Sequence, residues 1–135
     1  MSALSRQLAT GAFVVTAEIA PPKGTAIEPC LAVAKAFRGI TAINVTDNQG
    51  ANMRMSALAL AIKLKELGFE PVLQITCRDR NRLALQSDLL GAAALGVENL
   101  LILSGDHSRF GDHPDARPVF DIDSVQLLDT VAGLA

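Results

Sequence analysis

Val14-Val15-Thr16-Ala17-Glu18-Ile19-Ala20-Pro21-Pro22-Lys23 is the stretch of sequence that decides the fold. The β-branched residues at its start favour an extended chain, and the two consecutive prolines remove two backbone donors and so end a strand. Glu18 therefore lies within a few residues of the carboxyl end of a predicted strand. In parallel α/β folds this edge of the sheet carries the chemistry, which makes Glu18 the first candidate for a catalytic residue.

A repeat of about 28 residues extends this first unit through the chain. Glycines precede apolar runs at Gly11, Gly39, Gly68 and Gly96, with spacings of 28, 29 and 28. Each of the last three glycines follows a segment with helical apolar spacing, and glycine just past a helix end adopts the left-handed cap at little cost. Strand-like runs follow these glycines at Ala42–Thr46, Pro71–Thr76 and Leu100–Ser104. The pattern predicts four βα units.

Helices are also predicted at the two ends of the sequence. Leu4 and Leu8, four residues apart, are enough for a short helix that covers one end of the sheet. Asp123 or Ser124 is placed to cap a helix that runs through residues 127–131. The second of these helices completes the fourth βα unit.

The alternation of strands and helices implies a parallel sheet with right-handed crossovers. Two closures fit: an open doubly wound sheet, or a (β/α)8 TIM barrel, of which four units are about half because a complete barrel needs ~250 residues. The turn after the first strand is Ala20-Pro21-Pro22-Lys23-Gly24 and not a G-x-G-x-x-G phosphate loop, which counts against the open sheet. We therefore interpret residues 1–135 as a single partial domain of the α/β class, the N-terminal half of a barrel.

Composition narrows the choice of partners. The chain has 12 Lys and Arg against 14 Asp and Glu, a formal net charge of -2, with no basic stripe. We expect neither nucleic acid nor an anionic membrane as a partner. No stretch approaches the ~18 to 20 apolar residues of a membrane span, and no leader-like segment begins the sequence, so we expect a cytoplasmic protein. Cys30 and Cys77 belong to no metal-binding motif, and we expect free thiols.

A polar group lies at the end of each of the four predicted strands. These groups are Glu18; Thr46 with Asp47 and Asn48; Gln74 with Thr76; and Ser104-Gly105-Asp106. In a barrel, inward-facing side chains near the carboxyl ends of the strands converge on one mouth. Alternatively, polar residues mark where strands leave the core, which explains Asp47 and Asn48 well because Asp-Asn-Gln-Gly is also an ordinary turn. That alternative explains Glu18 less well, since its carboxylate precedes the turn and has apolar neighbours.

Two other polar segments have more than one interpretation. His107 and His113 lie six residues apart in a Gly/Asp/Pro loop, where no regular element sets the ligand spacing, so we expect surface histidines and no metal. The segment Arg78-Asp79-Arg80-Asn81-Arg82 concentrates three cations after the third predicted strand. These cations either bind acidic groups of a ligand, pair with Asp79 and Asp88, or remain solvated.

Taken together, the four strand ends resemble those of the methylenetetrahydrofolate reductase family, flavin-dependent enzymes of one-carbon metabolism. The motifs are Ala-Glu-Ile-Ala-Pro-Pro-Lys at 17–23, Val-Thr-Asp-Asn at 45–48, Gln-Ile-Thr-Cys-Arg-Asp at 74–79 and Leu-Ser-Gly-Asp at 103–106. The resemblance covers nearly the whole chain. The segment from Thr76 through Gly91 is similar to the branch in which the reductase is often fused behind a homocysteine methyltransferase domain.

The resemblance implies a (β/α)8 barrel that holds FAD at the carboxyl ends of its strands. Such an enzyme uses NAD(P)H to reduce 5,10-methylenetetrahydrofolate to 5-methyltetrahydrofolate, a step toward methionine biosynthesis. By position, Glu18 matches the family's general acid, and Asp106 matches an acidic residue near the flavin that also contacts folate. Cofactor-contacting positions are matched by Thr46, Gln74, Ser104, Gly105, Asp106, Phe120 and Asp121. Gln74 stands where better-known members carry histidine, and Ser104 where they carry arginine.

The resemblance also implies what four units lack, because the family's later strands supply further contacts to FAD, NAD(P)H and folate. We expect the chain to be a piece of a reductase, one that by itself binds FAD weakly or not at all and does not oxidise NAD(P)H. A second possibility is a non-catalytic flavin- or pterin-binding accessory chain, completed by a partner or by its own dimer. A third is a barrel that transfers methyl groups from folate without flavin, supported only by the shared architecture.

Overall fold

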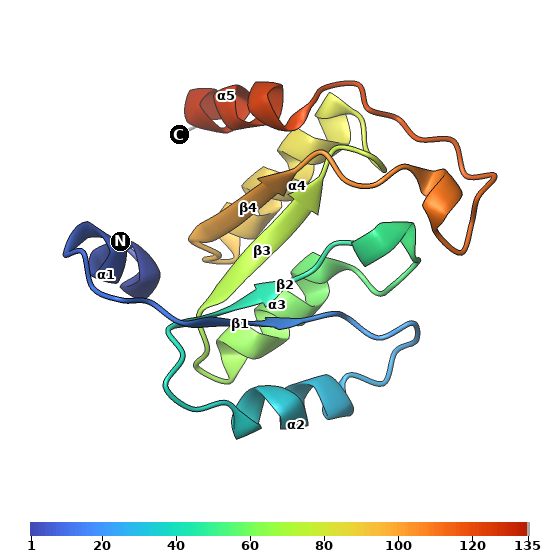
Figure 1. Ribbon diagram of the computed structural model, residues 1–135. Helices are drawn as coiled ribbons and strands as arrows, with labels where there is room; N and C mark the ends of the chain where they lie inside the picture. The colour runs from blue at the N-terminus through green and yellow to red at the C-terminus, as the bar shows by residue number, and fades with distance from the viewer. Residues whose placement is uncertain (135) are drawn as a thin grey trace.

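Four parallel strands form one sheet in the computed structural model, which describes residues 1–134 (Figure 1). In spatial order the strands are β1 (Thr16–Ile19), β2 (Ala42–Val45), β3 (Pro71–Thr76) and β4 (Asn99–Leu103). The α-helices are α1 (Ala3–Ala9), α2 (Glu28–Ala36), α3 (Ala57–Glu66), α4 (Arg82–Ala94) and α5 (Ser124–Leu134), and the 3-10 helices are η1 (Gln49–Ala51) and η2 (Ser108–Phe110). Parallel neighbours joined by helices confirm the prediction of four βα units with (β/α)8 barrel architecture.

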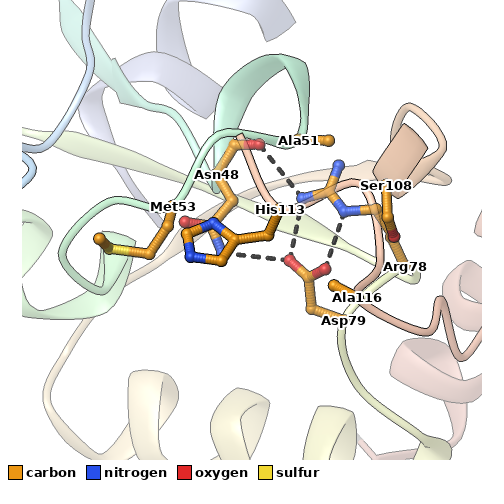
Figure 2. Close-up of a pocket in the computed structure, with 8 residues that line it drawn as sticks. All are labelled: Asn48, Ala51, Met53, Arg78, Asp79, Ser108, His113 and Ala116. Carbon is orange, nitrogen blue, oxygen red and sulfur yellow. Dashed lines mark hydrogen bonds and ion pairs between the residues drawn. The ribbon is translucent and has the colours of Figure 1, made fainter. Parts of the chain in front are cut away.

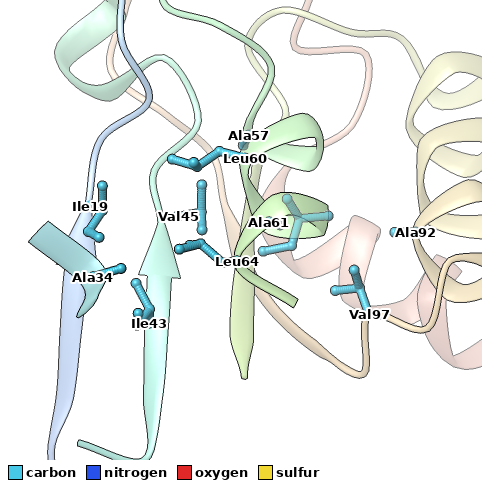
Figure 3. Close-up of a cluster of buried hydrophobic side chains, with 11 residues drawn as sticks. Ile19, Ala34, Ile43, Val45, Ala57, Leu60, Ala61, Leu64, Ala92 and Val97 are labelled. Carbon is cyan, nitrogen blue, oxygen red and sulfur yellow. The ribbon is translucent and has the colours of Figure 1, made fainter. Parts of the chain in front are cut away.

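The helices α2 to α5 cover one face of the sheet, and the alternation of side chains along the strands explains why. Ile19, Ile43, Val45 and Leu73 point to that face and pack against Ala34 of α2 and against Leu60 and Leu64 of α3 (Figure 3). A second cluster joins Ile75 and Cys77 to Leu85 and Leu89 of α4 and Leu127 of α5. Each fully buried leucine stabilises the fold by about 1.5–3 kcal/mol.

The opposite face of the sheet is mostly polar, and no helix of residues 1–134 covers it. Thr16 and Glu18 of β1 lie on this inner face, as do Asn44 of β2 and Gln74 and Thr76 of β3. Inner-face side chains fill the interior of a (β/α)8 barrel. Their polarity is therefore the first structural sign of where the chemistry lies.

The observed strand boundaries differ slightly from the predicted ones. The sequence predicts a first strand that starts near Val14, but β1 begins at Thr16, because its partner β2 begins only at Ala42 and that residue pairs with Thr16. The fourth strand ends at Leu103, one residue before the predicted Ser104. Residues 71–76 form β3 as predicted.

The last helix is capped as the sequence predicts. Oδ1 of Asp123 accepts a hydrogen bond from the backbone N–H of Gln126 at 2.8 Å, and Oε1 of Gln126 accepts one from the N–H of Asp123 at 3.0 Å. This reciprocal pair is a capping box. Of the two candidates, Asp123 is therefore the cap, and Ser124 is the first residue of α5.

Helix α1 covers the amino ends of the strands, and Glu70 holds it there. The carboxylate of Glu70 accepts hydrogen bonds from the backbone N–H groups of Ala3 and Leu4, each at 2.7 Å. Ser2 caps the helix through the N–H of Ser5 and also donates to Asn99 at 2.7 Å. Burial by itself raises the pKa of Glu70, but the hydrogen bonds from Leu4 and Ala3 outweigh it, so the pKa lies below the ordinary 4.5.

Acidification is expected to release α1 from the sheet. Because folding lowers the pKa of Glu70, the unfolded chain binds the extra proton, and the contribution of Glu70 is complete above pH 4.5 and lost as the pH falls through the lower folded value. Hydrogen exchange of the α1 amides should therefore accelerate below that pH before exchange in β3 does. Glu70→Gln should remove this pH dependence. Glu66→Gln should keep it, because within residues 1–134 the exposed carboxylate of Glu66 forms an ion pair with Lys63 alone. If hydrogen exchange of the α1 amides in Glu70→Gln still accelerated on acidification as it does in wild type, Glu70 would not be the group that holds α1 to the sheet.

Both cysteines are free, as expected from the sequence. Cys77 is fully buried, and burial followed by the nearby Asp123 charge raises the pKa of its thiol. None of the helices within residues 1–134 has the length and apolar character that a bilayer crossing requires.

Candidate functional site

The carboxyl ends of the strands open into a common mouth, on the side of the sheet where η1 and η2 lie (Figure 1). A cavity of about 100 Å³ lies there between the ends of β2, β3 and β4. It is lined by Asp47, Asn48, Gln49, Gly50, Gln74, Thr76, Arg78, Leu103, Gly105 and Asp106. The structure thus brings three of the residues predicted for the site, Gln74, Gly105 and Asp106, to the wall of one cavity.

Glu18 meets Gln74 across the inner face of the sheet. Nε2 of Gln74 donates a hydrogen bond to Oε2 of Glu18 at 3.2 Å, although the two residues lie on β1 and β3 with β2 between them. The register makes this possible: Glu18 is level with Asn44 and Val72, so Gln74 lies only two residues further toward the mouth. A side-chain amide both donates and accepts, so Gln74 can stay hydrogen-bonded to an ionised or a protonated carboxyl group. The pair suits a residue that gives up a proton.

Thr46 places an unused polar group beside this pair. Its hydroxyl oxygen is buried, the residue is 2% exposed, and that oxygen has no hydrogen-bond partner among residues 1–134. An unpaired buried hydroxyl costs about 1–3 kcal/mol, so it needs an explanation. A ligand that hydrogen-bonds at the end of β2 would satisfy it, and the residues present therefore fit the flavin that the resemblance implies.

Gly105 and Asp106 follow β4, and Gly105 lies against Thr76 at the end of β3. Gly105 has a φ of +92°, and a Cβ there would lie 3.1 Å from Cβ of Thr76 and 3.3 Å from Nη1 of Arg78. Glycine adopts this φ at little cost, whereas any other residue would be strained and would crowd Thr76 and Arg78. The carbonyl oxygen of Asp106 accepts from Nη1 of Arg78 at 3.0 Å, while its carboxylate is exposed and makes no hydrogen bond within residues 1–134. The carboxylate is thus available to a ligand in the mouth.

Four other predicted cofactor contacts do not line this cavity: Thr46, whose hydroxyl is buried, and Ser104, Phe120 and Asp121, whose side chains have other partners. Ser104 directs its hydroxyl to Ser124 at the start of α5, with 3.1 Å between the two oxygens. Asp121 forms an ion pair with Arg82, whose hydrogen bonds lower its pKa to about 2. The ring of Phe120 lies 6.5 Å from that of His107. None of these four residues lines the mouth cavity formed by the described part of the chain.

Sequence reasoning treated Asp47 as a turn residue, but it is one of the most highly connected side chains at the mouth. It is 4% exposed and accepts hydrogen bonds from the backbone N–H of Thr76 at 2.8 Å and from Nη1 and Nη2 of Arg80 at 2.8 and 3.0 Å. Nε of Arg80 lies 3.0 Å from the carboxylate of Asp88 on α4. The sequence does place an acidic residue, Asp47, after the second strand and a basic residue, Arg80, after the third. This order alone is too common to predict that the two side chains pair.

The three cations of residues 78–82 all pair with carboxylates. Arg78 pairs with Asp79 and Arg80 with Asp88, as one of the three interpretations predicts. Burial by itself raises the pKa of Asp79, but hydrogen bonds from Arg78 and Asn48 lower it overall. Arg78 is almost completely buried, so the interpretation of a solvated loop is wrong for this residue.

The β4–α5 loop (residues 104–123) reaches back over the ends of the earlier strands. Asp112 in this loop pairs with Lys23 after β1 at 2.7 Å and accepts a hydrogen bond from the N–H of Met53 at 2.9 Å. The hydrogen bond from Lys23 is the largest of the causes that lower the pKa of Asp112. Gly111 lies so close to the loop after β2 that a Cβ would overlap the carbonyl group of Ala51. The loop therefore ties β1 and β2 to β4 at the mouth.

Gly111→Ala is expected to destabilise the protein by about 1–3 kcal/mol, because the added methyl group forces the Ala51 backbone to move. Urea unfolding measures the change. Gly91→Ala is the matched control: a Cβ there meets nothing within 4 Å, and alanine in the middle of α4 should stabilise by about 0.5–1 kcal/mol. Equal effects of the two substitutions would show that the close approach is absent in solution.

The two histidines have local partners. Nδ1 of His107 accepts from the N–H of Arg109 at 3.1 Å, and Nδ1 of His113 lies 2.9 Å from Oδ1 of Asp112. Within residues 1–134 no group of three or more His, Cys, Asp or Glu side chains is arranged to hold a metal ion.

Fold and site together define the class of this protein. Four βα units of a (β/α)8 barrel present a carboxylic acid, an amide and an unpaired hydroxyl at the carboxyl ends of their strands, which is where barrel enzymes bind and convert small molecules. Comparison with known families identifies the particular one: the family model described as methylenetetrahydrofolate reductase matches residues 3–133, and the chain belongs to that family. No curated protein matches the chain. Membership confirms the resemblance read from the strand ends and supports an oxidoreductase whose general chemistry is folate reduction.

Proposed function

We propose that this chain is the acid-bearing half of a flavin-dependent barrel that reduces 5,10-methylenetetrahydrofolate to 5-methyltetrahydrofolate at the expense of NAD(P)H. The observation that carries the proposal is the hydrogen bond between Glu18 and Gln74, which holds a carboxyl group over the inner face of the sheet next to the mouth. Family membership supports the folate chemistry. The cytoplasm, where folates and reduced nicotinamides are at hand, is the proposed location.

Glu18 is proposed to protonate the folate so that its bridging ring opens to the reactive iminium. A positioned carboxylic acid contributes to such a step by donating its proton to the leaving nitrogen in the transition state. Gln74 orients the carboxyl group before and after the proton leaves, because its amide can accept from the acid or donate to the carboxylate. Asp106, with its carboxylate exposed at the same mouth, is proposed to contact the folate.

The FAD that the family uses would lie against Thr46, Gln74, Gly105 and Asp106, and when bound it supplies the transfer of hydride from NAD(P)H to the folate. In this role the hydroxyl of Thr46 gains the hydrogen-bond partner that it lacks. Gly105 allows close approach because its backbone is not covered by a side chain. Ser104, Phe120 and Asp121 would contact the cofactor only if the β4–α5 loop moves, since each is engaged elsewhere.

Half of a barrel is the proposed domain organisation. In the sheet of residues 1–134, β1 and β4 each have a single neighbour, so the outer edge of each strand presents unpaired backbone groups. Closing the barrel requires four more strands, which a further segment, a completing chain or a second copy would provide. The isolated chain is therefore expected to bind FAD weakly or not at all and not to oxidise NAD(P)H.

Two measurements test the proposal. The first reads the genomic DNA beyond the codon for residue 135, expresses any in-frame continuation, and looks for a flavin absorbance band that NAD(P)H bleaches and methylenetetrahydrofolate restores. The second assays the 135-residue chain alone. Robust turnover by a monomer of the isolated chain would refute the half-barrel, and a colourless completed protein would favour the non-catalytic accessory function.

A further inference from the structure

Arg78 connects three loops at the mouth with a single guanidinium group. It follows β3 and is 2% exposed. Nε and Nη2 donate to the two carboxylate oxygens of Asp79 at 2.8 and 2.9 Å. Nη2 also donates to the carbonyl oxygen of Asn48, after β2, at 3.1 Å, and Nη1 donates to the carbonyl oxygen of Asp106, after β4, at 3.0 Å.

Arg78 also forms part of the wall of two cavities. Arg78 lines the mouth cavity and also a second cavity of about 210 Å³, whose lining residues Figure 2 shows. Arg78 and Asn48 line both, while Met53 and His113 line only the second. Figure 2 shows the guanidinium group between Asn48 and Asp79, with the bonds to both drawn. Loss of this side chain would therefore remove part of the wall of both cavities and release the backbone at Asn48 and Asp106.

The backbone of Arg78 adds a fourth connection. Its carbonyl oxygen accepts from the N–H of Val119 at 2.7 Å, near the far end of the β4–α5 loop. Arg78 thus holds this loop at two places, at Asp106 where it begins and at Val119 where it returns toward α5. The carboxylate of Asp106 has no hydrogen bond of its own within residues 1–134, so its direction depends on the backbone that Arg78 holds.

We propose that Arg78 is a positioning residue that sets the carboxylate of Asp106 at the mouth and keeps the loops after β2 and β4 at a constant separation. The inference rests on the proposed function only for the task of Asp106; the positioning itself is independent of flavin and folate. Lysine cannot replace Arg78, because one ammonium group cannot reach Asp79, Asn48 and Asp106 in the planar geometry of a guanidinium. Asp79 is the counter-ion that makes the burial of this cation tolerable.

The test is made on the 135-residue chain without ligand, by NMR of Arg78→Lys. The expected result is a joint change in the chemical shifts of the Asp106 side-chain carboxyl carbon and of the Gly105 and Asn48 amides. The chemical shifts of the α2 amides should stay at their wild-type values. Arg38→Lys is the matched control, because Arg38 also donates to two backbone carbonyls but lies in the connection between α2 and β2. It should leave the Asp106 carboxyl signal unchanged.

Rescue separates positioning from a general loss of structure. Guanidinium at millimolar concentration should return the Asp106 and Asn48 signals of Arg78→Ala toward wild type, and urea at the same concentration should not. Should either Arg78 variant fail to fold, Asp79→Asn is measured in its place, since it keeps the arginine and weakens its anchor; the same signals should then shift. A wild-type Asp106 carboxyl signal in a folded Arg78→Lys or Asp79→Asn variant would overturn the proposal.

A parallel titration with FAD keeps the two proposals distinguishable. Where wild type binds FAD, folded Arg78→Lys should bind at least about tenfold more weakly, a difference of 1.4 kcal/mol. If the wild-type chain binds no FAD, the isolated chain is not a flavin-binding protein. The ligand-free NMR signals of Asp106 and Asn48 then decide the positioning role of Arg78 by themselves. Equal FAD affinity in both proteins, with shifted Asp106 signals, would overturn the link between positioning and the cofactor.

Discussion

Glu18→Gln is expected to slow folate reduction in the completed barrel by about 10²–10⁴-fold, the usual contribution of a general acid, while flavin reduction by NAD(P)H stays within about twofold. Glutamine keeps the size and the hydrogen-bonding capacity of the side chain but has no proton to give. The contact with Gln74 can survive the substitution, because two amides can pair. Stopped-flow absorbance separates the half-reactions: bleaching of the flavin by NAD(P)H, then its return on addition of the folate.

Glu28→Gln is the matched control for this experiment. Glu28 is an exposed carboxylate at the start of α2, on the helix-covered side of the sheet, and it should leave both half-reactions unchanged. An equal loss of both half-reactions in Glu18→Gln would contradict the role of proton donor. It would indicate instead that Glu18 serves to hold the cofactor or the fold.

Asp47→Ala is expected to lower the free energy of unfolding by about 3–5 kcal/mol, because it leaves the Arg80 cation without its main partner inside the protein. The backbone N–H of Thr76 at the end of β3 also loses its acceptor. Arg80 is partly exposed and keeps Asp88, which places the expected value toward the lower end of that range. Urea unfolding followed by circular dichroism measures the difference.

Asp129→Ala controls for the loss of one negative charge. Asp129 is exposed on α5 and makes no ion pair or side-chain hydrogen bond with any residue of 1–134, so its removal should change stability by less than about 0.5 kcal/mol. If Asp47→Ala and Asp129→Ala were equally stable, the network of Asp47, Arg80 and Thr76 would not contribute to folding in solution.

Much of the architecture could be predicted because it depends on local signals. Gly68 and Gly96 do end helices, with φ of 86° and 78°, and the strands follow them as expected. The prediction is wrong for Gly39, because α2 ends at Ala36 with an extended cap at Phe37, two residues before that glycine. Errors lay at the ends of β1, β2 and β4, where the strand boundary depends on the length of the neighbouring strand and not on residue preference. The family resemblance also lay in short contiguous motifs, and the match over residues 3–133 confirms it.

The arrangement of the site was less predictable, because its contacts join residues far apart in the sequence. Glu18 and Gln74 are 56 residues apart, and whether they meet depends on the stagger between three strands. Ser104 and Gly105 both follow the end of β4, yet the side chain of Ser104 points to α5 and not to the mouth. The reason is that alternate residues along a strand point to opposite faces of the sheet. A pattern of polar strand ends does not contain this information.

For this chain, then, the order of its βα units, the parallel sheet and the position of Glu18 near a strand's carboxyl end followed from sequence alone, since periodicity and turn residues act over a few positions. Tertiary structure decided which of the charged side chains face each other: the burial of Arg78 between three loops, the pairing of Asp47 with Arg80, and the unpaired hydroxyl of Thr46. The physical reason is that hydrogen bonds and ion pairs act over about 3 Å, a precision that is set only when strands have paired and loops have packed.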